Sequence, residues 1–351
     1  MLGVPATDCT ARAGEVWGGG KSATYAQIVA KGLTRSFTAD ELAAMPVKPA
    51  AERRLIGKPV TALEVAGKIN GSAVYGIDAR VDGMVYARPL LPPTRNGSVA
   101  TAVDDAAARG VKGYLSSLIL NDPSGTVPGW VMVVAESYPA ALKASDLVKV
   151  TWTPGPTAEV GEQQIQDLAR ALIADPAGGS PLDTGGGNTA AAFAAAASMI
   201  EQSYPTATVL HFQMEPVNAL AVEVDGVMEI HTGSQWQNLI LPQLAVALGR
   251  DESKVLLRTY PMGGGFGRRL NGDYAIPAAL AAQALGRPVK MILTRADDAR
   301  FDSVRSPSVQ TLRMAFDAKG AVTGMEHHAA AGWPAQVMAA FFMPMGTNNA
   351  P

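Results

Sequence analysis

Residues 254–293 read KVLLRTYPMGGGFGRRLNGDYAIPAALAAQALGRPVKMIL, and their pattern indicates the fold class. Lys254–Tyr260 is predicted to be a strand and Gly263–Gly267 a glycine turn. Apolar residues at helical spacing predict a helix over Tyr274–Leu285, and Pro288–Leu293 is predicted to be another strand. The order strand, turn, helix, strand predicts an α/β fold in which main-chain N–H groups of the turn, and a helix N-terminus, face a ligand beyond the strand end.

The rest of the chain continues this alternation of strands and helices. Asp225-Gly226 lies between two alternating runs and predicts a β-hairpin. Strands are predicted at 73–77, 84–87, 129–135, 148–152, 220–224 and 228–231, and helices at 25–32, 104–109, 137–148, 162–173, 190–202 and 240–248. Punctuation by Gly and Pro divides the chain into an irregular arm (1–62), a mixed α/β domain (63–153), a connector (154–204) and a second α/β region (205–351). The apolar run Ala339–Met343 needs a partner or more chain to bury it. We therefore expect the sequence to end within a folded domain.

Composition excludes several classes of function. The 351 residues carry 29 Lys+Arg and 31 Asp+Glu, a net charge of −2, so no basic excess is present to bind nucleic acid. One cysteine, Cys9, excludes an intramolecular disulfide framework. The four histidines show no zinc-binding spacing, so no metal ligands are predicted among them. The first thirty residues have no signal-peptide pattern, which leaves the cellular compartment open.

The glycine turn is the most informative motif. Counted from Gly263, the sixth position is Arg268 rather than glycine, so the turn is not the dinucleotide fingerprint. Gly18–Ser22 is not a phosphate loop either, because Glu15 stands where that motif needs glycine. From residue chemistry alone, Arg268 and Arg269 could clamp a phosphate, and the alternative is a tight structural turn.

Three other features have ordinary interpretations when taken alone. Gln235 follows a predicted strand and could point its amide toward the turn, although such a residue is more often simply exposed. Glu215 is expected to be a solvated residue in a turn. Alternating charges are expected to form a solvated salt-bridge network over Arg295, Asp297, Asp298, Arg300, Asp302 and Arg305.

Taken in order, five motifs resemble the molybdenum-binding large subunit of the xanthine dehydrogenase and aldehyde oxidase family. They are His211-Phe212-x-Met214-Glu215-Pro216-x-Asn218, Gly233-x-Gln235, Met262–Arg269, Gly286–Lys290 and Thr294-Arg295-x-Asp297-Asp298. The paired arginines resemble the isoquinoline 1-oxidoreductase beta-subunit branch. Lys68–Asp78 is similar to the start of the family's α/β hammerhead domain. The resemblance implies a hammerhead domain at 63–153 and an incomplete first molybdopterin-binding domain at 205–351.

The resemblance also implies an activity and a cofactor. The family members are molybdenum hydroxylases that oxidise aldehydes or N-heteroaromatic compounds with oxygen derived from water, using a molybdopterin dinucleotide, here expected in the cytosine form. Carried over by position, main-chain amides would contact the pterin and a molybdenum oxygen at Gly264, Gly265, Phe266 and Gly267. Gln235 would hydrogen-bond an oxo ligand, and Arg268 would contact a phosphate.

Partners and location follow from the same resemblance. A [2Fe-2S] iron–sulfur subunit, a cytochrome c subunit, the remaining part of the molybdenum subunit and a small-molecule substrate are expected. Location is expected to be periplasmic or membrane-associated, as in exported relatives, or else cytoplasmic. The family's general-base glutamate belongs beyond Pro351, so no catalytic residue is assigned and this chain alone is expected to be inactive. The alternatives are a non-catalytic scaffold subunit of the same fold and an anion-binding module.

Overall fold

The computed structural model describes residues 1–32, 35–175, 179 and 187–332. The chain forms two compact units, Met1–Ala66 and Gly67–Pro351. The apolar run Ala339–Met343 lies outside the described residues.

The first unit is built on a small antiparallel sheet of order β1-β2-β3. Its elements are η1 (Ala6–Asp8), β1 (Thr10–Arg12), β2 (Glu15–Gly18), β3 (Lys21–Thr24), α1 (Tyr25–Ala30), α2 (Ala39–Ala43) and η2 (Ala50–Glu52), and α3 (Val65–Asn70) follows at the boundary between the units. The helix predicted at 25–32 is present as α1, and Thr24 and Gln27 form a capping box at its start. The sheet was not predicted, because strands of three or four residues are too short to show an alternating pattern.

The second unit is organised around a seven-stranded sheet of order β12-β11-β10-β13-β4-β7-β6. Its strands are β4 (Val85–Leu90), β6 (Tyr114–Ile119), β7 (Val131–Ala135), β10 (Asn218–Val224), β11 (Val227–Thr232), β12 (Val255–Thr259) and β13 (Val289–Ile292). β13 pairs in parallel with β4, and β11 with β12, while the other neighbours are antiparallel. The α/β class is therefore confirmed. Strands from both predicted domains, 63–153 and 205–351, share this one sheet.

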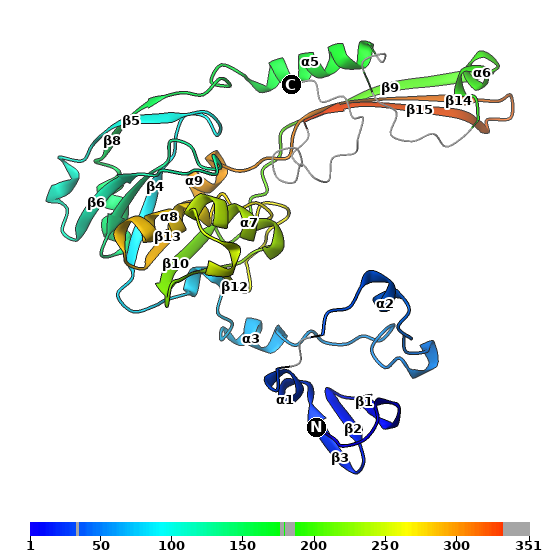
Figure 1. The fold of residues 1–351 in the computed structure, drawn as a ribbon. Coiled ribbons are helices and arrows are strands. Elements are labelled where there is room, and N and C mark those ends of the chain that lie inside the picture. The colour runs from blue at the N-terminus through cyan, green and yellow to red at the C-terminus, as the bar shows by residue number, and fades with distance from the viewer. Residues whose placement is uncertain (33–34, 176–178, 180–186, 333–351) are drawn as a thin grey trace. The chain divides into compact units, whose positions relative to one another are not determined.

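Helices cover the sheet and close the core. α7 (Gln237–Leu248) and α8 (Ile276–Leu285) pack on each other and on β10, β12 and β13 (Figure 1). α4 (Tyr138–Ser145) packs on β4 and β7, and α9 (Arg295–Arg300) follows β13. Side chains that are less than 2% exposed form the centre of the core, including Trp130, Met132, Leu220, Met228, Ile230, Ile240, Leu244 and Ile276. Burial of this apolar surface is the main stabilising contribution.

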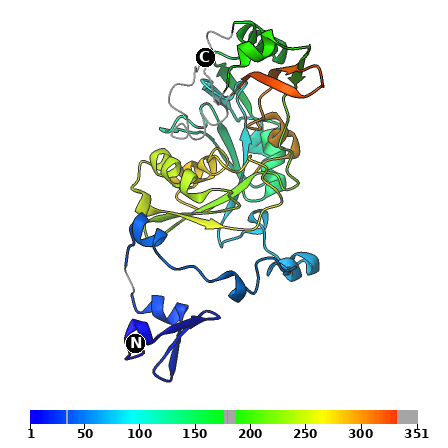
Figure 2. The same ribbon diagram turned by 90° about the vertical axis from the view of Figure 1, so that its right-hand side faces the viewer.

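The second unit also contains a separate, smaller sheet of order β15-β14-β9. It contains β9 (Ser198–Thr206), β14 (Ser308–Phe316) and β15 (Val322–Ala331), and it packs against α5 (Glu162–Ala174) and α6 (Thr189–Ala194). Figure 2 shows α5 stacked on these strands. The remaining elements are the strand pair β5 (Val99–Asp104) and β8 (Lys149–Thr153) and the short helices η3 (Gly76–Asp78), η4 (Ala108–Gly110) and η6 (Glu252–Lys254). None of the helices in the described ranges is long and apolar enough to cross a bilayer.

Local turn signals were the most accurate predictions. The hairpin between β10 and β11 is confirmed, with Asp225 at φ 49° and Gly226 at φ 76°, as a primed turn requires. Gly249 and Gly286 end α7 and α8 in the left-handed conformation, at φ 63° and 61°.

Three predicted elements are wrong. The strand at 73–77 is replaced by η3, and the helix at 104–109 is reduced to η4. The helix at 190–202 ends at Ala194, and the chain re-enters as β9 at Ser198. The alanine-rich composition favours a helix, but pairing with β14 decides the conformation from Ser198 onward.

Candidate functional site

The glycine turn lies between β12 and α8 and has an unusual backbone. Gly264 and Gly267 have φ of 99° and 107°, values that side chains rarely allow. Phe266 is also left-handed, at φ 53°, and its ring is exposed. Strained backbone of this kind is concentrated at binding sites. The helix begins only at Ile276, with residues 270–275 between, so the predicted helix N-terminus does not adjoin the turn.

Gln235 closes one side of the turn. Its Oε1 atom accepts hydrogen bonds from the main-chain nitrogens of Gly267, at 2.9 Å, and Arg269, at 3.3 Å. Two N–H donors at one end of the amide identify that end as the oxygen, so the Nε2 group faces away from the turn's backbone. Among the described residues, Nε2 has no acceptor. Gln235 is therefore an oriented donor beside the turn.

The turn itself leaves main-chain donors free. The N–H groups of Gly264, Gly265 and Phe266 have no acceptor within the described parts of the chain. A Cβ atom at Gly265 would lie 2.5 Å from Oε1 of Gln235, and one at Gly264 would lie 2.9 Å from the Phe266 ring. A side chain at Gly265 or Gly264 would therefore displace Gln235 or Phe266, and the positive φ of Gly264 also favours glycine. Three consecutive free donors suit a ligand that is rich in oxygen or nitrogen acceptors.

Glu215 lies beneath the turn and is not solvated as predicted. The residue is buried, and it accepts hydrogen bonds from the Gly263 nitrogen at 2.8 Å and from Nη2 of Arg269 at 3.0 Å. Its other oxygen accepts from the Ile77 nitrogen and from Nδ2 of Asn218, both at 3.0 Å. The expectation of a solvated turn residue is wrong because these donors, which are far apart in sequence, converge on it.

The paired arginines are interior residues, which corrects the predicted phosphate contact of Arg268. Both side chains are fully buried, and Arg268 pairs with Asp273 at 2.7 Å and with Asp302 at 3.2 Å. Neither side chain reaches the surface, so the structure does not present Arg268 to a phosphate. Burial by itself would raise the pKa of Asp273, but the adjacent charges of Arg268 and Arg95 outweigh it and hold that pKa below its usual value.

The charge cluster of residues 295–305 is also partly buried, contrary to the expectation of a solvated network. Asp298 accepts from Nε2 of Gln213, and burial raises its pKa. Asp302 bonds Nδ1 of His211 at 2.9 Å, and Nε2 of that histidine lies 3.1 Å from where a Cβ at Gly267 would be. Through Asp302 and His211, the cluster therefore contacts the glycine turn. The alternating pattern of charges in the sequence does not show this contact.

Further contacts around the turn were not predicted from the sequence. Arg305 donates to the Phe266 carbonyl at 2.9 Å, and the Tyr274 hydroxyl donates to the Gly233 carbonyl at 3.0 Å. Asp273 has no sequence signal that separates it from a surface residue. For Glu215 the only available signal was its place in the family-like motif. No three His, Cys, Asp or Glu side chains are grouped to hold a metal ion among the residues that the structure describes.

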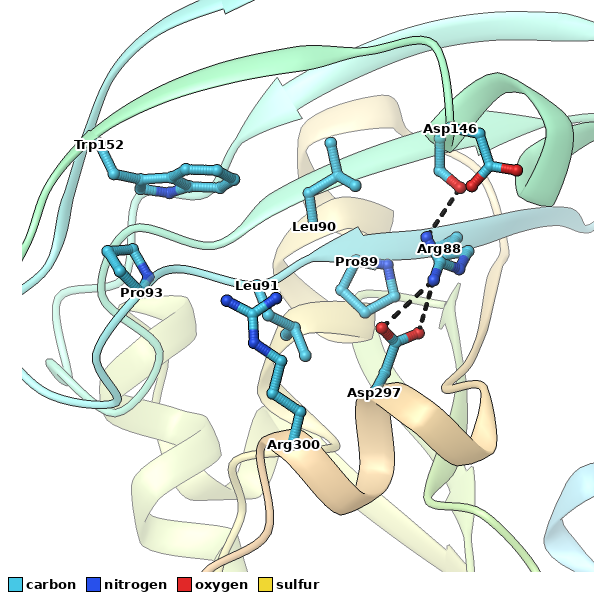
Figure 3. A pocket seen from close by; sticks show the side chains of 10 residues that line it. Arg88, Pro89, Leu90, Leu91, Pro93, Asp146, Trp152, Asp297 and Arg300 are labelled. Atoms are coloured by element: carbon cyan, nitrogen blue, oxygen red, sulfur yellow. Dashed lines mark hydrogen bonds and ion pairs between the residues drawn. The ribbon is translucent and has the colours of Figure 1, made fainter. Parts of the chain in front are cut away.

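A surface cavity of about 400 Å³ is lined in part by α9 (Figure 3). Arg88 binds both oxygens of Asp297 there, at 3.2 and 2.9 Å, and Arg300 extends from α9 between apolar residues. Its lining includes Trp152 but no residue of the glycine turn. We therefore place the candidate site at the turn and not in this cavity.

The family model that matches this chain defines a cofactor-binding domain. The chain belongs to the molybdopterin cofactor-binding domain family, whose model matches residues 161–347, more than half of the chain. The family resemblance predicted from the motifs is thereby confirmed.

Named relatives extend this finding. The chain is 54% identical over 354 residues to the membrane-bound aldehyde dehydrogenase [pyrroloquinoline-quinone] of Gluconacetobacter polyoxogenes, covering 100% of this chain and 46% of that protein. It is 32% identical to isoquinoline 1-oxidoreductase subunit beta of Brevundimonas diminuta, over 78% of this chain and 35% of that one. The aldehyde oxidoreductase structure from Desulfovibrio desulfuricans shares the fold, with a TM-score of 0.64 and 20% identity, over 79% of this chain and 35% of that one. The chain spans less than half the length of these relatives.

Proposed function

We propose that this chain supplies the molybdopterin-binding part of a molybdenum hydroxylase that oxidises aldehydes, with N-heteroaromatic compounds as the second substrate class. The order of preference follows the relatives: the one that is 54% identical is named an aldehyde dehydrogenase, and the one that is 32% identical an isoquinoline oxidoreductase. The domain division 63–153, 154–204 and 205–351 is part of this proposal.

One observation carries the proposal: the oriented Nε2 group of Gln235 lies beside three consecutive free N–H groups, those of Gly264, Gly265 and Phe266. Fixed donors of this kind stabilise oxygen-rich ligands without rearrangement. When bound, the molybdenum cofactor would supply the oxidising centre and the water-derived oxygen. This chain would orient the group through these amides, and through Gln235 at an oxo ligand.

The pterin is proposed as the cytosine dinucleotide. Its phosphates are assigned to main-chain groups, because the side chains of Arg268 and Arg269 are enclosed. This enclosure also disfavours the simple anion-binding module. The relative from Gluconacetobacter is named for pyrroloquinoline quinone, so that quinone is the second candidate cofactor.

The partners are proposed as a [2Fe-2S] subunit that accepts electrons, a cytochrome c subunit, and the rest of the molybdenum subunit with its general-base glutamate. Location at a membrane or in the periplasm is proposed from the name of the membrane-bound relative.

The test is cofactor analysis of the protein purified with its natural companion chains. Elemental analysis should find molybdenum, oxidative release should give a fluorescent pterin, and acid hydrolysis should give cytidine monophosphate. A quinone without pterin would support the second cofactor. Protein lacking both, from a host that loads other family members, would contradict the hydroxylase and favour the non-catalytic scaffold.

A further inference from the structure

The two ends of the glycine turn meet at a single carboxylate oxygen. Oε2 of Glu215 accepts the Gly263 N–H at 2.8 Å and Nη2 of Arg269 at 3.0 Å. Gly263 begins the turn, and Arg269 is the second residue after its last glycine, Gly267. Because one oxygen binds both residues, it links the main chain at the start of the turn to a side chain from just beyond its end.

The backbone of Glu215 reinforces the same contacts. Its N–H donates to the Gly263 carbonyl at 3.1 Å, and its own carbonyl accepts from Nη2 of Arg269 at 2.9 Å. A Cβ at Gly263 would lie 2.6 Å from Cβ of Glu215, so the two segments are in close contact. The arrangement of Glu215, Gly263 and Arg269 is called the clamp below.

The other oxygen of Glu215 ties the clamp to a distant part of the chain. Oε1 accepts the Ile77 N–H and Nδ2 of Asn218. The segment of Ile77 is itself fixed, because Nζ of the buried Lys290 donates to the Gly76 carbonyl at 2.6 Å. Four donors therefore face one buried carboxylate, and an amide or a protonated acid in its place would set a donor against a donor.

We propose that Glu215 is a positioning residue, which holds the glycine turn in the shape that presents its free N–H groups to the cofactor. The identity of that cofactor rests on the proposed function. The existence of the clamp does not depend on it. Glu215 has both oxygens occupied and is enclosed, so it does not act on substrate. Removing its charge loosens Gly263 and Arg269 together and lowers the occupancy of the site.

The experiment compares Glu215→Gln with Glu223→Gln in the protein produced with its natural companion chains. Glu223 undergoes the same chemical change at the surface, where it pairs with Arg250. Hydrogen–deuterium exchange is followed in a peptide spanning residues 262–270, with β7 as the internal reference. We expect exchange at the turn to accelerate about tenfold or more in E215Q only, because hydrogen bonds to a charged group are lost, with β7 unchanged.

Cofactor content per protein is measured in the same samples, and it should fall in E215Q and not in E223Q. Equal exchange at the turn in the two variants overturns the clamp. Acceleration that is as large in β7 as at the turn also overturns it, because it shows only a general loss of stability. Faster exchange at the turn in a protein that never contains pterin leaves the clamp standing and removes the proposed function.

If E215Q does not fold, Arg269→Lys provides the test. This variant keeps the positive charge but loses the guanidinium group, whose Nη2 atom donates to both the carboxylate and the main-chain carbonyl of Glu215. Local acceleration at residues 262–270 is again expected, and exchange at the wild-type rate in a folded R269K overturns the clamp.

Discussion

Oε1 of Gln235 lies 2.9 Å from the main-chain nitrogen of Gly267, so a side chain from the end of β11 fixes the last glycine of the turn after β12. These strands are parallel neighbours. Their carboxyl ends lie at the same edge of the sheet, which is why residues 32 positions apart become a single donor surface.

Glycine at 265 is expected to be irreplaceable for cofactor binding. A Cβ there would lie 2.5 Å from Oε1 of Gln235, so Gly265→Ala must displace that side chain. Overpacking of this kind costs about 1–3 kcal/mol of stability, which leaves the fold intact. We expect molybdenum and pterin content to fall sharply. Gly110→Ala is the matched control, because nothing lies within 4 Å of its Cβ position. Normal cofactor content in G265A would contradict the assigned site.

The amide of Gln235 is expected to matter for binding and little for folding. Gln235→Ala removes two accepted hydrogen bonds, each worth about 0.5–1.5 kcal/mol, from an exposed position. Cofactor content should decrease while the unfolding transition moves little. Gln237→Ala is the comparison, since Gln237 donates to Thr259 at the surface. Equal cofactor retention in both variants counts against the role of Gln235.

Arg268 is expected to be essential for stability. Arg268→Met leaves the buried carboxylates of Asp273 and Asp302 without this partner, a change that typically costs about 3–5 kcal/mol. Denaturant titration should show this loss. Arg258→Gln, which breaks an exposed pair with Glu229, should cost about 0–1 kcal/mol. Comparable losses in the two variants would mean that the buried network does not stabilise the fold.

Lys290 is expected to make stability rise with alkaline pH. Burial lowers the pKa of Lys290 from 10.5 to about 8. Between these values the unfolded chain binds more protons than the folded chain, so the free energy of unfolding increases with pH across this window. Below it, the cost of burying the charge is present in full. Denaturant titrations from pH 7 to 10.5 should show a rise in wild type relative to Lys290→Met. Parallel curves would contradict the lowered pKa.

Much of the fold could be read from local signals. Gly226, Gly249 and Gly286 occupy backbone conformations that depend on few neighbours, and the elements that they end were predicted correctly. β9 and the strands of the first unit were missed because their conformation depends on pairing partners far along the chain. At the site, the motifs singled out the turn and Gln235 as candidates, and their role stays a prediction, whereas the burial of Glu215 and Arg268 was not predicted.

The sequence alone determined the family, because ordered motifs around a glycine turn are a local property of the chain. It also located the glycine turn, and the structure shows left-handed backbone at Gly264 and Gly267, which most side chains avoid. Only the tertiary structure decided which charges are inside. Arg268, Glu215 and Asp298 have ordinary sequence surroundings, and their burial results from partners that the sheet brings together from distant segments. Buried charge pairs of this kind leave no periodic pattern in the sequence. They can be recognised only once the folded structure is known.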